Sequence, residues 1–163
     1  MQESDNFISE QLLLMCAWVL TDSLKPEAAI RFMLATHLND LPDRPVWVDG
    51  SGLSRYNLTT PRNMVYLWNK IAHQIPYERL FALLAAGGQS GTLRNWYKAG
   101  DNQKPYIFGK TGTLSNNHCL SGFLITRKNR VLIFSFMNSN YVQPVTMLRR
   151  EMEIVLKTIH DKL

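Results

Sequence analysis

The sequence predicts an α+β fold, and three observations support this prediction. Apolar residues recur at helical spacing in the first half, form strand-like runs between residues 106 and 137, and return to helical spacing at the C-terminus. Helices followed by an antiparallel sheet and one long helix indicate helices packed on a sheet. At 163 residues, 45% hydrophobic and 19% charged, the chain can bury one core. We therefore expect residues 1–163 to form a single unit.

Four helices are expected before the sheet. The first runs from Ser4 to about Leu20, with Ser4 or Asp5 as N-cap, because a set of side chains follows the 3.6-residue period: Phe7, Ile8, Gln11, Leu12, Met15 and Val19. The other three begin at a proline or aromatic residue and cover Pro26 to about Leu38, Thr60–Pro61 to about Ile75, and Tyr77 to Ala86.

Short strands and turns complete the prediction. Val46–Val48 indicates a strand, and Asp49–Ser54 a turn-rich loop with two glycines. Residues 87–103 are loop-like, and Asn102–Lys104 indicates a surface turn. Three strands then follow, the last two joined by a tight hairpin at Lys128–Asn129: Tyr106–Thr113, Leu120–Arg127 and Arg130–Met137. Pro144 opens a final helix whose predicted apolar face is Leu148, Met152, Val155, Ile159 and Leu163.

Composition excludes several classes of function. The net charge of +5 comes from scattered basic residues, which favour anionic ligands such as a peptide carboxylate. The basic residues form no stripe with interleaved aromatics, so the sequence does not indicate nucleic-acid binding. The longest apolar run, Leu12–Leu20, is too short to span a bilayer, and no signal-peptide pattern is expected. The four histidines show no metal-ligand spacing. Cys16 and Cys119 are expected to be buried free thiols.

Two short motifs carry the chemistry. Lys110-Thr111-Gly112 follows the strand-like run Tyr106–Phe108, and Ser4-Asp5-Asn6 opens the first helix. A Ser-x-Asn element upstream of Lys-Thr-Gly is found in penicillin-interacting serine enzymes. Each motif has a structural alternative, since Ser4 and Asn6 suit a helix cap and Lys110 suits a solvated strand position.

Further segments resemble one family. Asp49–Leu58 resembles the DGSGLSRxN segment of the peptidase S13 family, the penicillin-binding protein 4-type D-alanyl-D-alanine carboxypeptidases and endopeptidases. Gly91–Arg94, Lys110–Thr113 and Leu120–Phe123 match the same family in the same order. The resemblance covers essentially the whole chain and corresponds to the C-terminal part of a family member. It implies a remnant of the β-lactamase/transpeptidase-like domain.

The resemblance also implies a site. Ser4 is expected to relay a proton to the leaving amine, Asn6 to bind the substrate amide, and Lys110 to raise the potential and position Ser4. Thr111 and Thr113 are expected to bind the terminal carboxylate of a peptidoglycan stem peptide, and the Thr113 N–H to donate to the oxyanion. Gly112 leaves room for substrate against the strand. The implied partner is a stem peptide or a β-lactam, the implied location is extracytoplasmic, and no metal or organic cofactor is implied.

The chain departs from the family in one respect: no Ser or Thr is followed three residues later by Lys, so the Ser-x-x-Lys nucleophile element is missing. We therefore expect the carboxypeptidase activity to belong to a longer parent and this chain to be inactive alone. A non-catalytic peptide-binding module and a serine β-lactamase relative are the alternatives. The missing helix should leave an apolar groove, closed by a second copy, by shifted helices or by another chain. Of these, we expect self-association.

Overall fold

The computed structural model describes residues 1–100 and 104–163, and the chain divides into two compact units. One unit comprises Met1–Ser4 and Leu67–Leu163, and the other comprises Asp5–Tyr66. The boundary falls inside helix α3, Pro61–Gln74. The predicted turn at Asn102–Lys104 lies largely outside the described residues. The prediction of a single unit over residues 1–163 stays a prediction.

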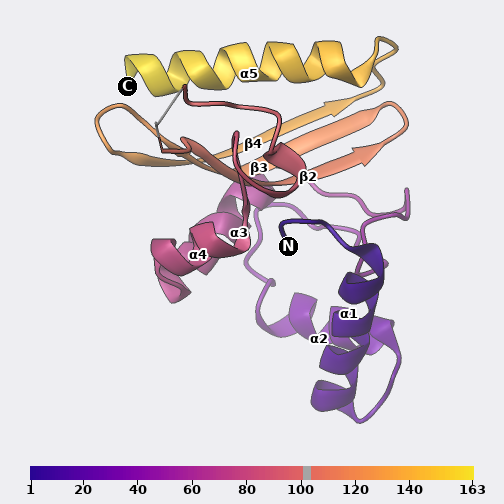
Figure 1. The fold of residues 1–163 in the computed structure, drawn as a ribbon. Coiled ribbons are helices and arrows are strands. Elements are labelled where there is room, and N and C mark those ends of the chain that lie inside the picture. Colours follow the sequence, from indigo (N-terminus) through magenta and orange to yellow (C-terminus); the bar gives the residue numbers. More distant parts are fainter. Residues whose placement is uncertain (101–103) are drawn as a thin grey trace. The chain divides into compact units, whose positions relative to one another are not determined.

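The larger unit is built on a four-stranded antiparallel sheet of order β1-β2-β3-β4 (Figure 1). Three strands lie close to the predicted ones: β2 Ile107–Leu114, β3 Asn117–Ile125 and β4 Val131–Ser139. The fourth, β1 Ala85–Ala86, was expected to end a helix, but α4 covers only Tyr77–Leu83. Pairing of the two alanines with Gly109 and Phe108 outweighs their helix propensity. The α+β prediction is confirmed.

Both faces of this sheet are covered. Helix α5, Val145–Lys162, runs along one face (Figure 1), where Met152 and Leu156 share a core with Ile107, Leu120 and Leu124. On the other face, Phe123 packs with Trp68, Leu80 and Leu84.

The predicted apolar face of the final helix is partly wrong. Leu148, Met152 and Ile159 pack against the core as expected, but Val155 and Leu163 are each 43% exposed, and Leu156 takes the buried position. Leu156 lies four residues after Met152, and Ile159 lies three residues after Leu156, so the buried stripe passes through these positions and Val155 lies at its edge.

The smaller unit contains α1 Asn6–Thr21, α2 Pro26–Thr36 and the first turns of α3. Its core consists of Leu13, Ala17, Ala29 and Ile30. No single helix among the described residues is long and apolar enough to cross a membrane, although α1 and α2, bent by 70°, meet the length and composition criteria together.

Helix α1 buries a different face from the one its period suggested. The side chains of the predicted stripe are exposed, Phe7 by 72%, Met15 by 62% and Val19 by 80%, whereas Leu13 and Ala17 are buried. Because α1 is apolar almost all round, its periodicity could not distinguish the covered face from the uncovered one. The helix begins at Asn6 with Asp5 as its N-cap, since the Asp5 side chain accepts the Ile8 N–H.

The segment that resembled the S13 family forms a self-bonded loop. The Asp49 carboxylate accepts N–H groups from Gly52 and Ser54 at 2.7 Å each and the Asn57 side-chain amide at 2.9 Å. The predicted strand Val46–Val48 is reduced to one bridge between Val46 and Leu58. These bonds give the segment a structural role.

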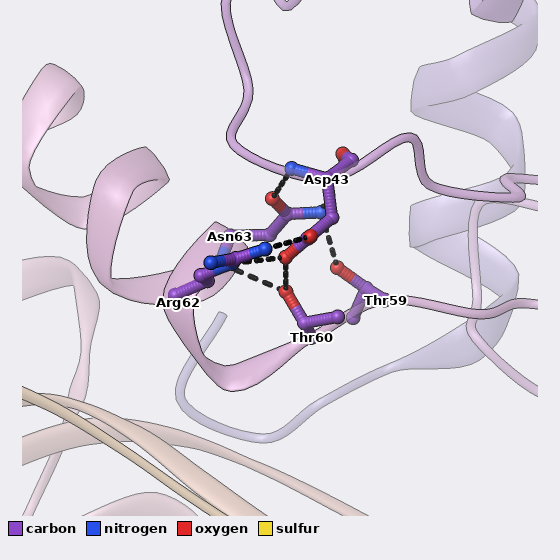
Figure 2. Close-up of polar contacts among 5 residues, drawn as sticks. All are labelled: Asp43, Thr59, Thr60, Arg62 and Asn63. Carbon is purple, nitrogen blue, oxygen red and sulfur yellow. Dashed lines mark hydrogen bonds and ion pairs between the residues drawn. The ribbon is translucent and has the colours of Figure 1, made fainter.

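A second polar cluster fixes the start of α3 (Figure 2). The Asp43 carboxylate accepts both the Thr60 hydroxyl, at 2.5 Å, and the Arg62 guanidinium. The Asn63 side chain, 2% exposed, accepts the Asp43 N–H and donates to the Asp43 carbonyl, both at 2.9 Å. Hydrogen bonding to Arg62 and then Thr60 lowers the pKa of Asp43 to about 2.

Candidate active-site wall

Ser4 and Lys110, 106 positions apart in sequence, are in direct contact. The Lys110 ammonium donates to Ser4 Oγ at 2.5 Å and to the Thr111 carbonyl at 2.6 Å. Ser4 has a φ of 56°, in the left-handed region that a serine rarely adopts. A backbone held there is a frequent property of functional residues. Ser4 of the predicted Ser-x-Asn motif and Lys110 of the predicted Lys-Thr-Gly motif are therefore in contact.

The N-terminal segment is held in place by its neighbours within the same unit. The Gln2 side chain donates to the Ala82 carbonyl at 2.9 Å, and the Gln2 carbonyl accepts the Thr92 N–H at 3.2 Å. Gly91 opens the short helix η1, Gly91–Leu93, and a Cβ there would lie 2.4 Å from the Gln2 carbonyl oxygen. The absence of a side chain at Gly91 thus allows the approach that places Ser4.

Lys110 lies half-buried on β2. Burial lowers the pKa of its ammonium below the ordinary value. On the adjacent strand, its register partner Ser121 is buried and accepts the Trp68 indole N–H at 3.0 Å. The Lys110 ammonium thus places a positive charge on this sheet face, next to the Ser4 hydroxyl.

Beyond Lys110, one edge of β2 is open. Strand β1 pairs only with Phe108 and Gly109, so residues 110–114 have no strand partner on that side within the described chain. The Ile107 carbonyl accepts the Gly87 N–H on the β1 side. Because backbone groups of an antiparallel strand alternate in direction, the N–H and C=O groups of Thr111 and Thr113 also point to the open edge.

The two threonines have different hydroxyl partners. Thr111 Oγ1 donates to Thr92 Oγ1 at 2.8 Å, which joins the Lys-Thr-Gly strand to the Gly91–Arg94 segment. Thr113 Oγ1 lies 2.8 Å from His118 Nδ1, across the β2–β3 hairpin. His118 is 1% exposed, and burial followed by the positive charge of Arg149 lowers its pKa to about 4. His118 is therefore neutral at pH 7.

Gly112 leaves space beside the open edge, since a Cβ on it would meet no atom within 4 Å. Asn6 is the exposed first residue of α1 and belongs to the smaller unit, and its expected hydrogen bond to the substrate amide stays a prediction. Ser4, Lys110, Thr111, Gly112 and Thr113 all belong to the larger unit. An ammonium, hydroxyls and outward N–H groups along one open edge can hold an extended, carboxylate-ended peptide.

Two residues that contact the candidate active-site wall, which consists of Ser4 and the open edge of β2 from Lys110 to Thr113, have roles that the sequence analysis missed. Thr92 was assigned only to a family segment, and His118 carried no signal, because its approach to Thr113 follows from the hairpin register. Both cysteines are free, but Cys16 is exposed, so its predicted burial is wrong. In the part of the chain that the structure describes, no three His, Cys, Asp or Glu side chains gather to hold a metal ion.

Comparison with known proteins links this wall to one family. The sequence model of the D-Ala-D-Ala carboxypeptidase 3 (S13) family matches residues 1–159. The chain is 34% identical over 148 residues to the carboxypeptidase DacB of Mycolicibacterium smegmatis, covering 86% of this chain and 32% of that protein. It is 31% identical over 97 residues to the D-alanyl-D-alanine carboxypeptidase DacB of Haemophilus influenzae, covering 57% of this chain and 20% of that protein.

Solved structures show the same fold. Penicillin-binding protein 4 of Haemophilus influenzae, complexed with a β-lactam, aligns with a TM-score of 0.81 at 22% identity over 99% of this chain and 40% of that one. A predatory endopeptidase of Bdellovibrio bacteriovorus, in complex with an immunity protein, aligns with a TM-score of 0.71 at 19% identity over 97% and 41%. The chain thus spans about a third of the length of the first relative and two fifths of these structures.

Proposed function

Because the chain belongs to the D-Ala-D-Ala carboxypeptidase 3 (S13) family, we propose that it forms the substrate-binding wall of a serine-type D-Ala-D-Ala carboxypeptidase. The observation that carries this proposal is the 2.5 Å hydrogen bond from Lys110 to Ser4 beside the open edge of β2. The substrate is a peptidoglycan stem peptide ending in D-Ala-D-Ala, and the parent works outside the cytoplasm, where that polymer lies.

In the proposed complex, the stem peptide lies along the open edge of β2. The hydroxyls of Thr111 and Thr113 and the Lys110 ammonium attract its terminal carboxylate. The Thr113 N–H points out of the sheet, as an oxyanion donor must. Gly112 allows the peptide to approach the strand without meeting a side chain.

The reaction itself needs a nucleophile that this chain lacks. A serine outside the chain attacks the penultimate D-Ala carbonyl, and the C–N bond to the terminal D-Ala then breaks. The proton that the attacking serine loses reaches the departing amine through the Ser4 hydroxyl, and Lys110 keeps that hydroxyl oriented for the transfer. Water then releases the acyl group. Asn6 is the proposed donor to the substrate amide. On this proposal the chain alone binds the peptide without cleaving it.

The first test is intact-protein mass after incubation of the full chain with excess penicillin, together with an assay of D-Ala release from N-acetyl-D-Ala-D-Ala. We expect no adduct and no release. A covalent adduct would show that a serine of this chain acts as nucleophile, and peptide mapping would begin at Ser4. Hydrolysis of the β-lactam would instead favour the β-lactamase alternative.

The second test is binding of the same dipeptide, followed by NMR. We expect Lys110→Met and Thr113→Val each to weaken binding by about tenfold, the value of one charge-assisted hydrogen bond. Arg130→Met, which removes a cation whose guanidinium donates to the Leu163 carbonyl, is the matched control and should bind normally. Equal binding by all four proteins would refute the proposal. Binding without any acylation in a longer parent would favour the non-catalytic module.

Self-association, expected from the missing nucleophile helix, also stays a proposal, and we place its contact on the exposed apolar side chains of α1. Its exposed apolar side chains include Phe7, Met15 and Val19, and its one charged residue, Glu10, already accepts N–H groups of Gly50 and Ser51. A second copy of this basic chain therefore meets no like charge at that face. Light scattering at high concentration should give a dimer that Met15→Lys dissociates, whereas a monomeric mass for the unmodified chain would contradict the proposal.

A further inference from the structure

The contact between Thr113 and His118 bears on how the proposed site recognises a carboxylate. The two residues face each other on β2 and β3, and Thr113 Oγ1 lies 2.8 Å from His118 Nδ1. Thr113 is exposed on the edge strand, whereas its cross-strand partner His118 is buried at 1% exposure. One side of the Thr113 hydroxyl therefore faces the imidazole, and the other is accessible to a ligand.

The backbone at His118 is tied to the neighbouring strand. Its backbone carbonyl accepts the Asn138 side-chain amide from β4 at 3.3 Å, and that amide also contacts the Met152 sulfur of α5 at 3.4 Å. The charge that acts on the ring comes from Arg149 on the same helix. The buried imidazole, carried on a backbone tied to β4, can orient the Thr113 hydroxyl that it contacts.

The direction of the hydrogen bond decides what Thr113 can do. A threonine hydroxyl carries one proton, and the Nδ1 atom of a neutral imidazole either accepts a proton or donates one, according to its tautomer. If Nδ1 accepts, the Thr113 proton is used internally and the hydroxyl presents only lone pairs, which repel a carboxylate. If Nδ1–H donates, the Thr113 proton is directed outward.

We infer that His118 is a positioning residue for carboxylate recognition: in the ligand-bound state its Nδ1–H donates to Thr113 Oγ1 and leaves the Thr113 proton for the ligand. This inference rests on the proposed function, since it assigns a role to His118 in binding the D-Ala-D-Ala carboxylate. His118 acts only through Thr113 and does not touch the substrate.

The test measures binding of N-acetyl-D-Ala-D-Ala to the full chain and to a set of variants. His118→Phe should weaken binding about fivefold, because the hydroxyl loses one oriented neutral hydrogen bond. His118→Asn should bind almost normally, since its amide can donate from nearly the same position. In a Thr113→Val background, His118→Phe should have no further effect, because the residue through which it acts is gone.

A second measurement needs no variant. Long-range proton–nitrogen NMR of the unmodified chain reports which imidazole nitrogen carries the proton, and we expect protonated Nδ1 in the complex. Unprotonated Nδ1 there, or normal binding by a folded His118→Phe, would overturn the inference and leave the proposed function intact. Failure of the unmodified chain to bind the dipeptide would overturn both.

Discussion

Burial of His118 should make the stability of the larger unit depend on pH. The pKa of this imidazole falls from an ordinary 6.5 to about 4 on folding. Between these two pH values, the unfolded chain therefore binds a proton at His118 that the folded chain does not bind. The stabilisation is complete above pH 6.5 and is lost progressively as the pH falls towards 4. From the two pKa values, the loss is roughly 1 kcal/mol at pH 5.5 and roughly 2–3 kcal/mol at pH 4.5.

The assay is urea unfolding at pH 7.5, 5.5 and 4.5, in a Trp18→Phe/Trp47→Phe background. Fluorescence then reports on Trp68 and Trp96, which lie in the larger unit. His118→Phe is the control, because it keeps a buried ring and cannot titrate. The difference in unfolding free energy between the two proteins should shrink by the amounts given above.

Two results would refute this reasoning. One is a His118 imidazole that titrates near pH 6.5 in the folded chain by NMR. The other is an unfolding free energy with the same pH dependence in the His118→Phe protein. Carboxyl groups that titrate below pH 4.5 affect both proteins alike and cancel in the comparison.

Three further predictions concern other positions. Asp43→Asn should remove an acid-labile contact of the smaller unit. The depressed pKa of Asp43, about 2, implies stabilisation that is lost as the pH falls from about 4 to about 2. An acid titration followed by amide NMR should show this loss of stabilisation. Gly122→Ala should destabilise the sheet by about 3 kcal/mol in urea unfolding, because its φ is 151° and the new Cβ would lie 2.2 Å from the Phe108 carbonyl oxygen. Unchanged stability would contradict that geometry. Gly112→Ala should leave stability within about 0.5 kcal/mol yet weaken binding of the D-Ala-D-Ala dipeptide, and normal binding would count against substrate lying on this edge.

Much of the fold follows from local patterns. The three long strands, the helices beginning at Pro26 and Pro61, and the C-terminal helix were predicted within a few residues, because each carries its own period or proline signal. The two-residue strand at Ala85–Ala86 was missed, since alanine favours helix and only pairing with β2 makes these residues extended. Such pairing is a long-range event with no local signature.

The exposed face of α1 illustrates a second limit. Phe7, Met15 and Val19 recur at helical spacing, as buried residues do, but Leu13 and Ala17 occupy the covered side. Period alone cannot identify the covered side of a helix that is apolar almost all round. What packs against the helix decides it.

By itself, the sequence determined the α+β class and the S13 resemblance, and it predicted the site residues Ser4, Asn6, Lys110, Thr111, Gly112 and Thr113. Only the tertiary structure decided that Lys110 donates to Ser4, that Thr92 contacts Thr111 and that His118 lies under Thr113. The physical reason is one of range. Propensity and periodicity act over a few neighbouring residues, whereas the contacts among positions 4, 92 and 110 depend on packing between distant segments, and the contact between Thr113 and His118 depends on strand register.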